Sequence, residues 1–151
     1  MKISDYQFEK ICAIDPQREP LTGSMIVIYP QSAYKNTKNI PLNKYGKGPY
    51  CKFKISNSRK SCGVYAITVD ASPVYIGECI NLSKRYNMGY GNISPRNCFR
   101  WGQETNCRIN NLIYDAALLG KRIELWFYPT LDYKMVEQNL RNFLKPDWNK
   151  V

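Results

Sequence analysis

The pattern of hydrophobic and polar positions predicts secondary structure most clearly between residues 63 and 81. Residues 63–69 are rich in β-branched and aromatic side chains, and residues 74–77 form a second run of the same kind. The four residues between them have turn chemistry, because Asp and Pro favour tight turns. This pattern predicts a β-hairpin. Asn81 follows it and can cap a helix that begins directly afterwards.

A longer helix is predicted after residue 104. Thr105 is the candidate N-cap, and Gly120 is expected to end the helix because glycine adopts the left-handed conformation found at helix C-termini. The apolar residues follow the i, i+3, i+4, i+7 spacing of one helix face. These residues are Ile109, Leu112, Ile113 and Ala116.

Two further elements complete the C-terminal part. Residues 123–128 predict a third strand, closed by Pro129, and the long helix before it suits a strand that rejoins the hairpin in one sheet. A last helix is predicted from Asp132 to the residue before Pro146. Its inward-facing stripe is Val136, Leu140, Phe143 and Leu144.

The N-terminal part has a less regular pattern. Residues 4–13 predict a short helix with Ser4 as its N-cap, and residues 25–29 predict a strand. Residues 31–49 have no clear period and predict a long basic loop. Residues 50–55 alternate apolar with basic side chains, which predicts a half-buried strand.

Composition favours an anionic partner over the alternative of a basic surface that only contacts solvent. The 151 residues, 44% of them hydrophobic, suffice for one domain with a packed core and an added flank. The formal charge of +10 includes eight basic and no acidic residues at positions 35–60, where aromatic side chains are interleaved. Lysines neutralise phosphates and aromatic rings stack on bases, so this segment predicts nucleic-acid contacts. The lysines singled out as phosphate contacts are Lys38, Lys44 and Lys47.

Residues 86–103 are rich in Gly and Asn and predict an irregular loop. One interpretation is a surface loop that covers the edge of the sheet. The other is a loop that contacts nucleic acid beside an active site, because amide and guanidinium groups can reach base edges. The candidates for such contacts are Asn92, Arg96, Arg100 and Gln103.

Cysteine and histidine usage narrows the chemistry. The chain has six cysteines without a CxxC pair and no histidine, which disfavours a zinc site and excludes both a His-activated nucleophile and an imidazole base. We interpret the cysteines as reduced thiols of a cytoplasmic protein. The apolar runs are too short to span a bilayer, so no membrane partner is expected.

Tyr65, Tyr75 and Arg85 follow one another at intervals of ten residues. A Gly-Val-Tyr strand, a Tyr-Ile-Gly strand and an Arg at this spacing resemble the GIY-YIG nuclease family, most of all its small restriction endonucleases. The resemblance runs over residues 62–150. It implies an α/β (α+β) fold with a small three-stranded antiparallel sheet flanked by helices.

The same resemblance implies a division of the chain. Residues 62–151 would form the GIY-YIG catalytic domain. Residues 1–61 would be a basic N-terminal flank, packed on that domain, with extra strands and a short helix.

The resemblance also implies roles for five residues. Tyr65 would take a proton from the attacking water, Tyr75 would orient that water or the phosphate, and Arg85 would hold a phosphate oxygen. Glu137 would bind the catalytic metal, and Asn149 would brace the site. From the residues alone, the favoured interpretation of Glu137 is a surface carboxylate paired with Arg141 one helical turn later, and only the motifs shared with the family favour the metal ligand.

Two positions depart from the family's pattern. Some members carry a Lys three residues after the second tyrosine, where this chain has Glu78, an alternative second metal ligand. Many members carry a His or Tyr four residues after the arginine, where this chain has Gly89. Whether Tyr86 or Tyr90 takes that role stays open at the level of sequence.

The implied activity is that of a metal-dependent DNA endonuclease. One carboxylate suits a single divalent ion, Mg²⁺ with Mn²⁺ able to substitute. A near-minimal catalytic module without a separate DNA-binding domain resembles the restriction-type enzymes, and one site per chain favours a homodimer on duplex DNA. The alternatives are a repair-type or homing-type GIY-YIG nuclease, or a non-catalytic nucleic-acid-binding module on the same scaffold.

Overall fold

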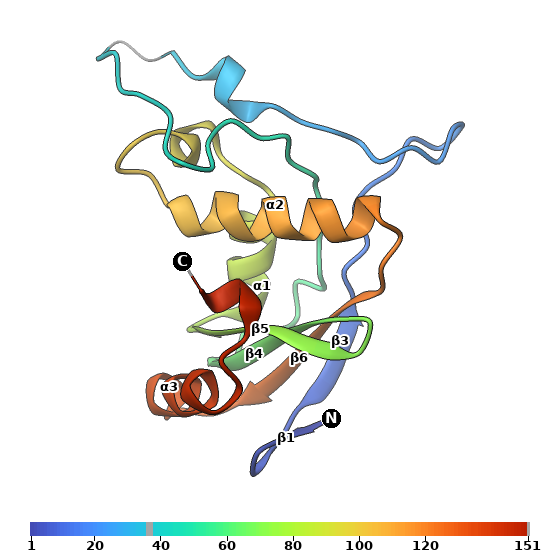
Figure 1. The fold of residues 1–151 in the computed structure, drawn as a ribbon, viewed down its shortest axis with the longest axis vertical. Coiled ribbons are helices and arrows are strands. Elements are labelled where there is room, and N and C mark those ends of the chain that lie inside the picture. The colour runs from blue at the N-terminus through green and yellow to red at the C-terminus, as the bar shows by residue number, and fades with distance from the viewer. Residues whose placement is uncertain (36–37, 151) are drawn as a thin grey trace.

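The computed structural model describes residues 1–35 and 38–150, so positions 36–37 of the predicted basic loop and position 151 lie outside the described residues. A four-stranded antiparallel sheet with the order β3-β6-β4-β5 forms its centre (Figure 1). Its strands are β3 (Glu9–Ala13), β4 (Gly63–Val69), β5 (Ser72–Cys79) and β6 (Ile123–Pro129). A separate two-stranded sheet pairs β1 (Lys2–Ile3) with β2 (Tyr6–Gln7).

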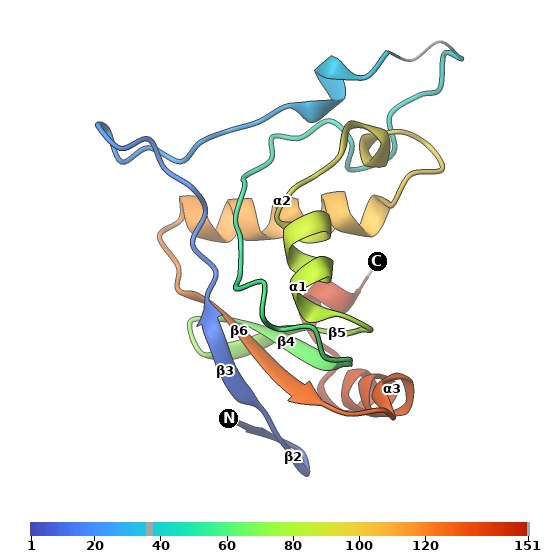
Figure 2. The same ribbon diagram turned by 180° about the vertical axis from the view of Figure 1, so that it is seen from behind.

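Helices cover both faces of the central sheet. The helix α2 (Glu104–Leu118) lies on one side and α3 (Tyr133–Leu144) on the other (Figure 1). Seen from behind, α1 (Leu82–Arg85) and the helical residues after it lie between the end of β5 and α2 (Figure 2). Because both faces are covered, β4 is buried along nearly its whole length, which explains its continuous apolar run.

The alternation along β4 divides the core into two clusters. Tyr65 and Ile67 join the cluster on the α2 side, and Val64 and Ala66 join the cluster on the α3 side. The predicted hairpin is confirmed, although its second strand is longer than predicted. The predicted third strand is confirmed as well, because β6 pairs with β4 along its whole length.

The predicted helix at residues 4–13, and with it the short helix of the N-terminal flank, is wrong. Ser4 has a positive φ of 54° in the turn between β1 and β2, and residues 9–13 form β3. β3 pairs antiparallel with β6, Glu9 lying opposite Phe127. The hydrogen bonds of this long-range pairing outweigh the weak helix preference of a ten-residue segment. The extra strands predicted for the flank are present.

Residues 25–29 and 50–55 are extended but do not form the predicted strands. They meet only at the isolated bridge between Ile28 and Tyr50. The predicted alternation of burial in residues 50–55 is correct, with Phe53 buried and Lys54 exposed. The backbone of residues 50–55 instead forms hydrogen bonds with asparagine side chains, which take the place of a neighbouring strand. These bonds include Cys51 N to Asn110 Oδ1 at 3.0 Å and Ile55 N to Asn87 Oδ1 at 2.7 Å.

The two predicted C-terminal helices are confirmed with small differences. α2 begins at Glu104, and its N-cap is Gln103, two residues before the predicted Thr105. Val136 and Leu140 are buried in α3 as predicted, but Phe143 is 66% exposed and lies outside the cluster that they join. Within residues 1–35 and 38–150, no helix is both long and apolar enough to cross a membrane.

Residues of the N-terminal flank share the core with the rest of the chain. Ile14, Phe53 and Ile55 belong to the same cluster as Tyr65. A third cluster joins Tyr50 to the region after α1; its other buried members are Ile93, Cys98, Phe99 and Cys107. The flank therefore packs closely on residues 62–150, and the division at residues 61 and 62 stays a prediction.

Candidate active site

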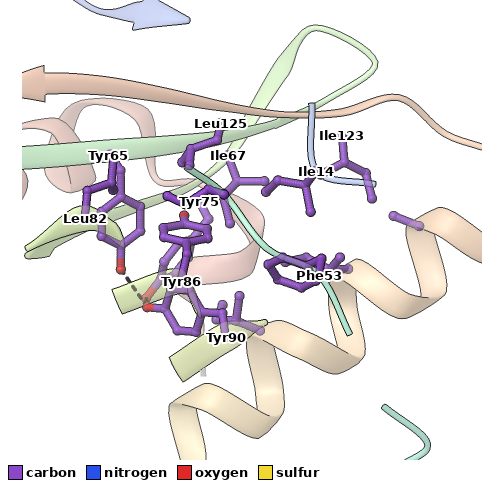
Figure 3. Packing of buried hydrophobic residues seen from close by; sticks show 14 of the residues in the cluster. Ile14, Phe53, Tyr65, Ile67, Tyr75, Leu82, Tyr86, Tyr90, Ile123 and Leu125 are labelled. Carbon is purple, nitrogen blue, oxygen red and sulfur yellow. Dashed lines mark hydrogen bonds between the residues drawn. The ribbon is translucent and has the colours of Figure 1, made fainter. Parts of the chain in front are cut away.

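Three tyrosine hydroxyls meet on the α2 side of the hairpin (Figure 3). Tyr65 lies opposite Gly77 and Tyr75 lies opposite Ile67, so the two tyrosines are diagonal neighbours on one face. Tyr90 approaches from the helical segment after α1. Its hydroxyl lies 2.6 Å from that of Tyr65 and 3.4 Å from that of Tyr75.

Arg85 connects this hydroxyl cluster to the surface. Its Nη2 donates to the Tyr90 hydroxyl at 2.9 Å and its Nε to the Tyr65 hydroxyl at 3.4 Å. The guanidinium carbon lies 4.6 Å from the centre of the Tyr90 ring. Arg85 also lines an open cleft of about 710 Å³, which we call the Arg85 cleft; other residues lining it include Glu78, Asn81, Lys84 and Gln103.

Tyr90, and not Tyr86, contacts the arginine and both strand tyrosines. Residues Tyr86–Tyr90 form one turn of π-helix, closed by the bond from Gly91 N to Tyr86 O at 2.7 Å. A π-turn holds one residue more than an α-turn, so a side chain five residues after Arg85 reaches the place that a fourth residue would occupy in an α-helix. The predicted irregular loop therefore begins after Tyr90.

Tyr86 packs at the side of the cluster. Its ring meets that of Tyr65 edge-on, with the ring centres 5.3 Å apart. Among the described residues, no hydrogen-bond partner reaches its buried hydroxyl. Edge-to-face packing of this kind holds the Tyr65 ring in one orientation.

Burial dominates the electrostatics of the tyrosines. It raises the pKa of Tyr65 well above the ordinary phenol value, and the neighbouring Tyr90, Tyr75 and Tyr86 raise it further. Arg85 acts in the opposite direction, which agrees with the role expected of it, but the pKa of Tyr65 stays high. The resting form of Tyr65 is therefore the neutral phenol.

The glycine of the Tyr-Ile-Gly motif makes room for Tyr65. A Cβ atom at Gly77 would lie 2.4 Å from both the Tyr65 hydroxyl oxygen and its Cζ. The ring packs directly over the backbone of β5 at this point. Any larger residue at position 77 would displace the Tyr65 hydroxyl from Tyr90 and Arg85.

Glu137 lies apart from the tyrosines, on α3. It forms an i, i+4 ion pair with Arg141 at 3.3 Å, and 15% of its side chain is exposed. Burial raises the pKa of Glu137, Arg141 lowers it, and the charge of Glu78 raises it further. Glu78 lies on β5 and lines the Arg85 cleft, so a carboxylate that acts on the pKa of Glu137 also lies in the cleft with Arg85.

Asn149 fastens the C-terminal segment to the sheet. Its Nδ2 donates to Ile76 O at 2.8 Å, and its Oδ1 accepts from Ile76 N at 2.8 Å. β5 is an edge strand, so the N–H and C=O groups of Ile76 have no neighbouring strand to pair with. The Asn149 amide provides their hydrogen bonds instead. The neighbouring Trp148 carbonyl accepts a hydrogen bond from Arg108 of α2.

Arg108 is a residue that the sequence interpretation missed. Only 8% of it is exposed, and its charge lowers the pKa of the adjacent Tyr75, although burial raises that pKa above the ordinary value. No spacing rule points to it, because it lies between apolar positions of a helix. The hydrogen bond to Trp148 makes it part of the support behind Asn149.

The comparisons with known proteins bear on the fold. No family model and no curated protein matches the chain. A solved structure of bacteriophage T4 EndoII, in a Glu-to-Ala mutant, resembles it with a TM-score of 0.53 and 22% identity, over 73% of this chain and 86% of that chain. The chain has the GIY-YIG fold. The resemblance recognised from the two tyrosine motifs is thereby confirmed at the level of fold.

Within this GIY-YIG fold, the predicted DNA-contacting residues lie on two loops that pack together. Asn43 Nδ2 donates to Asn97 O at 2.6 Å, and Arg100 N donates to Pro41 O at 2.8 Å. Residues 38–47 of the basic flank and residues 91–103 after α1 therefore form one packed layer. The sequence interpretation treated them as separate segments. Six of the seven predicted contact residues in this layer are exposed, namely Lys38, Lys44, Lys47, Asn92, Arg100 and Gln103.

Three of the predicted loop contacts have defined surroundings. Gln103 lines the Arg85 cleft, and Arg100 lies over the ring of Trp101, which is 73% exposed. Arg96 is partly buried, and its Nη1 donates to Arg100 O at 3.1 Å. Gln103 is thus the predicted contact residue that the structure places beside Arg85.

The carboxylates of this GIY-YIG fold suit one hard divalent ion. In residues 1–35 and 38–150, no three His, Cys, Asp or Glu side chains form a ligand cluster. Mg²⁺ needs no such cluster, because one or two carboxylates plus substrate phosphate and water satisfy it. Glu137 and Glu78 repel one another, and a cation near Glu137 would relieve that repulsion. The residues present therefore fit a single ion at Glu137.

Proposed function

We propose that the protein is a divalent-metal-dependent DNA endonuclease that hydrolyses phosphodiester bonds in duplex DNA. This proposal rests on the buried Tyr65, Tyr75 and Tyr90 hydroxyls, which converge behind Arg85, a residue that lines the Arg85 cleft. The fold supports it, because the similar EndoII is a GIY-YIG nuclease. The net charge of +10 suits a polyanionic substrate.

Arg85 is proposed to bind the scissile phosphate from the Arg85 cleft. A guanidinium has five N–H donors, and the bonds to Tyr65 and Tyr90 leave others for the non-bridging oxygens. The negative charge that develops on these oxygens is stabilised most by a donor already held in place. The stacking on Tyr90 and the two hydrogen bonds provide that placement.

Tyr65 is proposed to accept the proton of the attacking water, and Tyr75 to orient that water through its hydroxyl. Because the neutral phenol is the resting form, the reactive fraction is the small phenolate population that Arg85 favours. Tyr90 holds both Tyr65 and Arg85, so it positions base and phosphate ligand relative to one another.

Glu137 is proposed to hold one Mg²⁺, for which Mn²⁺ would substitute, and Asn149 to brace the edge strand that carries Tyr75. When bound, such an ion supplies Lewis-acid stabilisation of the leaving oxygen. Glu137 suits this role because its carboxylate is largely buried. Its ion-pair partner Arg141 is partly exposed, so a metal ion could replace it.

Within this activity we propose a restriction-type enzyme. Sequence selection would come from the layer formed by the basic flank and the loop after α1, with Lys38, Lys44 and Lys47 on phosphates. Asn92, Arg96, Arg100 and Gln103 would read base edges. One active site per chain cuts both strands of a duplex either as a homodimer or in two successive nicks.

Incubation of the purified protein with plasmid mixtures, in Mg²⁺ and in EDTA, tests the proposal. Discrete fragments in Mg²⁺ are expected, and EDTA should suppress them. A smear would replace the restriction-type assignment by a non-specific nuclease. DNA binding without cleavage in Mg²⁺ or Mn²⁺ would contradict the enzymatic function and favour a non-catalytic binding module.

Replacement of Tyr65 by Phe is expected to lower kcat by about 10²–10⁴-fold with little change in DNA affinity, because it removes only the proton-accepting hydroxyl. In the wild type, the phenolate fraction rises tenfold per pH unit below the raised pKa, so cleavage should accelerate as pH increases from 6 to 9. The variant should lose this dependence. If the variant kept the wild-type rate and pH profile, a group other than Tyr65 would accept the proton of the attacking water.

Gly77→Ala is expected to reduce cleavage on the order of 10²-fold, because the new Cβ forces the Tyr65 hydroxyl out of position. The measurement is kcat on a duplex substrate, alongside the midpoint of thermal unfolding and the DNA affinity. Retained binding with a lost rate would place the effect at the hydroxyl cluster. Normal cleavage would show that Tyr65 does not need its present position.

A further inference from the structure

A second hollow lies on α3, where it meets the C-terminal turn. It has a volume of about 470 Å³, and we call it the α3 cleft. Its lining consists of three cationic side chains, three amide side chains and one proline, and among the described residues no acidic side chain contributes to it. The charged and amide members are Gln138, Arg141, Asn142, Lys145, Asn149 and Lys150.

We propose that the α3 cleft binds a backbone phosphate of the DNA substrate next to the one that is cleaved, a proposal that rests on the proposed nuclease function. Guanidinium, ammonium and amide N–H groups are the donors that hold phosphate oxygens in protein–DNA interfaces. Arg141 and Lys145 come from the end of α3, and Lys150 follows the C-terminal turn. The donors therefore converge from two elements.

The helix dipole accounts for only part of this arrangement. Cations near a helix C-terminus are favourable, which explains Arg141 and Lys145 at the end of α3. It does not explain Lys150, which belongs to another element, or the amides of Asn142 and Asn149 in the same hollow. A phosphate site explains all of them together.

Present contacts leave the cations available. Lys150 pairs with Asp147 at 2.9 Å, but both side chains are largely exposed, and such pairs contribute little. Arg141 pairs with Glu137 at 3.3 Å with 46% of its own side chain exposed. Lys145 is exposed and has a left-handed backbone, with φ of 49°.

The position of the α3 cleft relates it to the active site. Asn149 lines it and also clamps Ile76, the neighbour of Tyr75. Arg141 lines it and also pairs with Glu137. A phosphate in the cleft would draw Arg141 away from Glu137 and leave that carboxylate free, so DNA binding and exposure of the proposed metal ligand are coupled through one guanidinium.

The test is DNA binding in EDTA, which needs no metal and no cleavage. Fluorescence anisotropy with a labelled duplex is recorded over a series of salt concentrations for Arg141→Gln and Lys145→Asn; asparagine suits the left-handed backbone at 145. Lys134→Gln is the matched control, because it removes one exposed charge from the same helix outside the cleft. Thermal unfolding verifies that each variant is folded.

Each cleft variant is expected to reduce the slope of log K against log salt by about 0.9, the value for one lost phosphate contact, and Lys134→Gln should not. Wild-type slopes in both cleft variants, or an equal loss in the control, would overturn the site. Reduced slopes without cleavage in Mg²⁺ would support the site and contradict the proposed nuclease. A wild-type protein that binds no DNA would contradict both.

Discussion

Glu137→Gln is expected to abolish DNA cleavage while DNA binding persists. The amide keeps the shape of the side chain but removes the negative charge that a hard divalent ion requires. Folding should be little affected, because the lost ion pair with Arg141 is a partly exposed helix pair of about 0.3–0.5 kcal/mol. The measurement is single-turnover cleavage of a labelled duplex in Mg²⁺, with affinity determined in EDTA.

Asp115→Asn is the control for this substitution, since it neutralises an exposed carboxylate on α2. It should cleave at the wild-type rate. Near-normal cleavage by Glu137→Gln would contradict the assignment of the metal ligand. If Glu78→Gln were inactive at the same time, the ligand would be Glu78, the carboxylate that shares the cleft with Arg85.

Arg85→Ala is expected to reduce the cleavage rate by at least 10²–10³-fold, the loss typical of a removed donor to a developing charge. Arg85→Lys should restore little of it. Arg85 bonds Tyr65 and Tyr90 through different nitrogens and stacks on the Tyr90 ring, and an ammonium can reproduce only the charge. Rates are measured under single turnover across the pH range used for Tyr65.

The loss should lie in the rate and not in the fold. The tyrosine hydroxyls remain hydrogen-bonded to one another without the arginine, so the midpoint of thermal unfolding should change little. Arg122→Lys is the matched control, because Arg122 lies directly before β6 and its side chain is exposed although it pairs with Glu124. Recovery of most of the wild-type rate by Arg85→Lys would contradict the role given to the several N–H donors of the guanidinium group.

The hairpin and its site were predictable because their determinants are local. The β-branched run of β4, the turn after it and the ten-residue spacing of Tyr65, Tyr75 and Arg85 all lie within about 25 consecutive residues. The π-turn was not predictable from the Gly-rich sequence after Arg85. It becomes intelligible only once the Tyr90 hydroxyl is seen between Tyr65 and Arg85.

Features that depend on distant partners escaped the sequence interpretation. Residues 9–13 form a strand because β6, more than 100 residues later, offers an open edge. Residues 50–55 stay extended because Asn110 and Asn87 bond their backbone. The α3 cleft and Arg108 depend equally on where the C-terminal turn lies, which no local pattern encodes.

Cleavage of supercoiled plasmid by the wild-type protein, with Mg²⁺ and with EDTA, tests the central claim most directly when Arg85→Ala is purified in parallel. The parallel preparation excludes a contaminating nuclease, since both proteins share every purification step. Metal-dependent cleavage by the wild type and none by the variant is the predicted result. Equal cleavage by both, or none by the wild type in Mg²⁺ or Mn²⁺ while it still binds DNA, would contradict the proposed phosphodiester hydrolysis at this site.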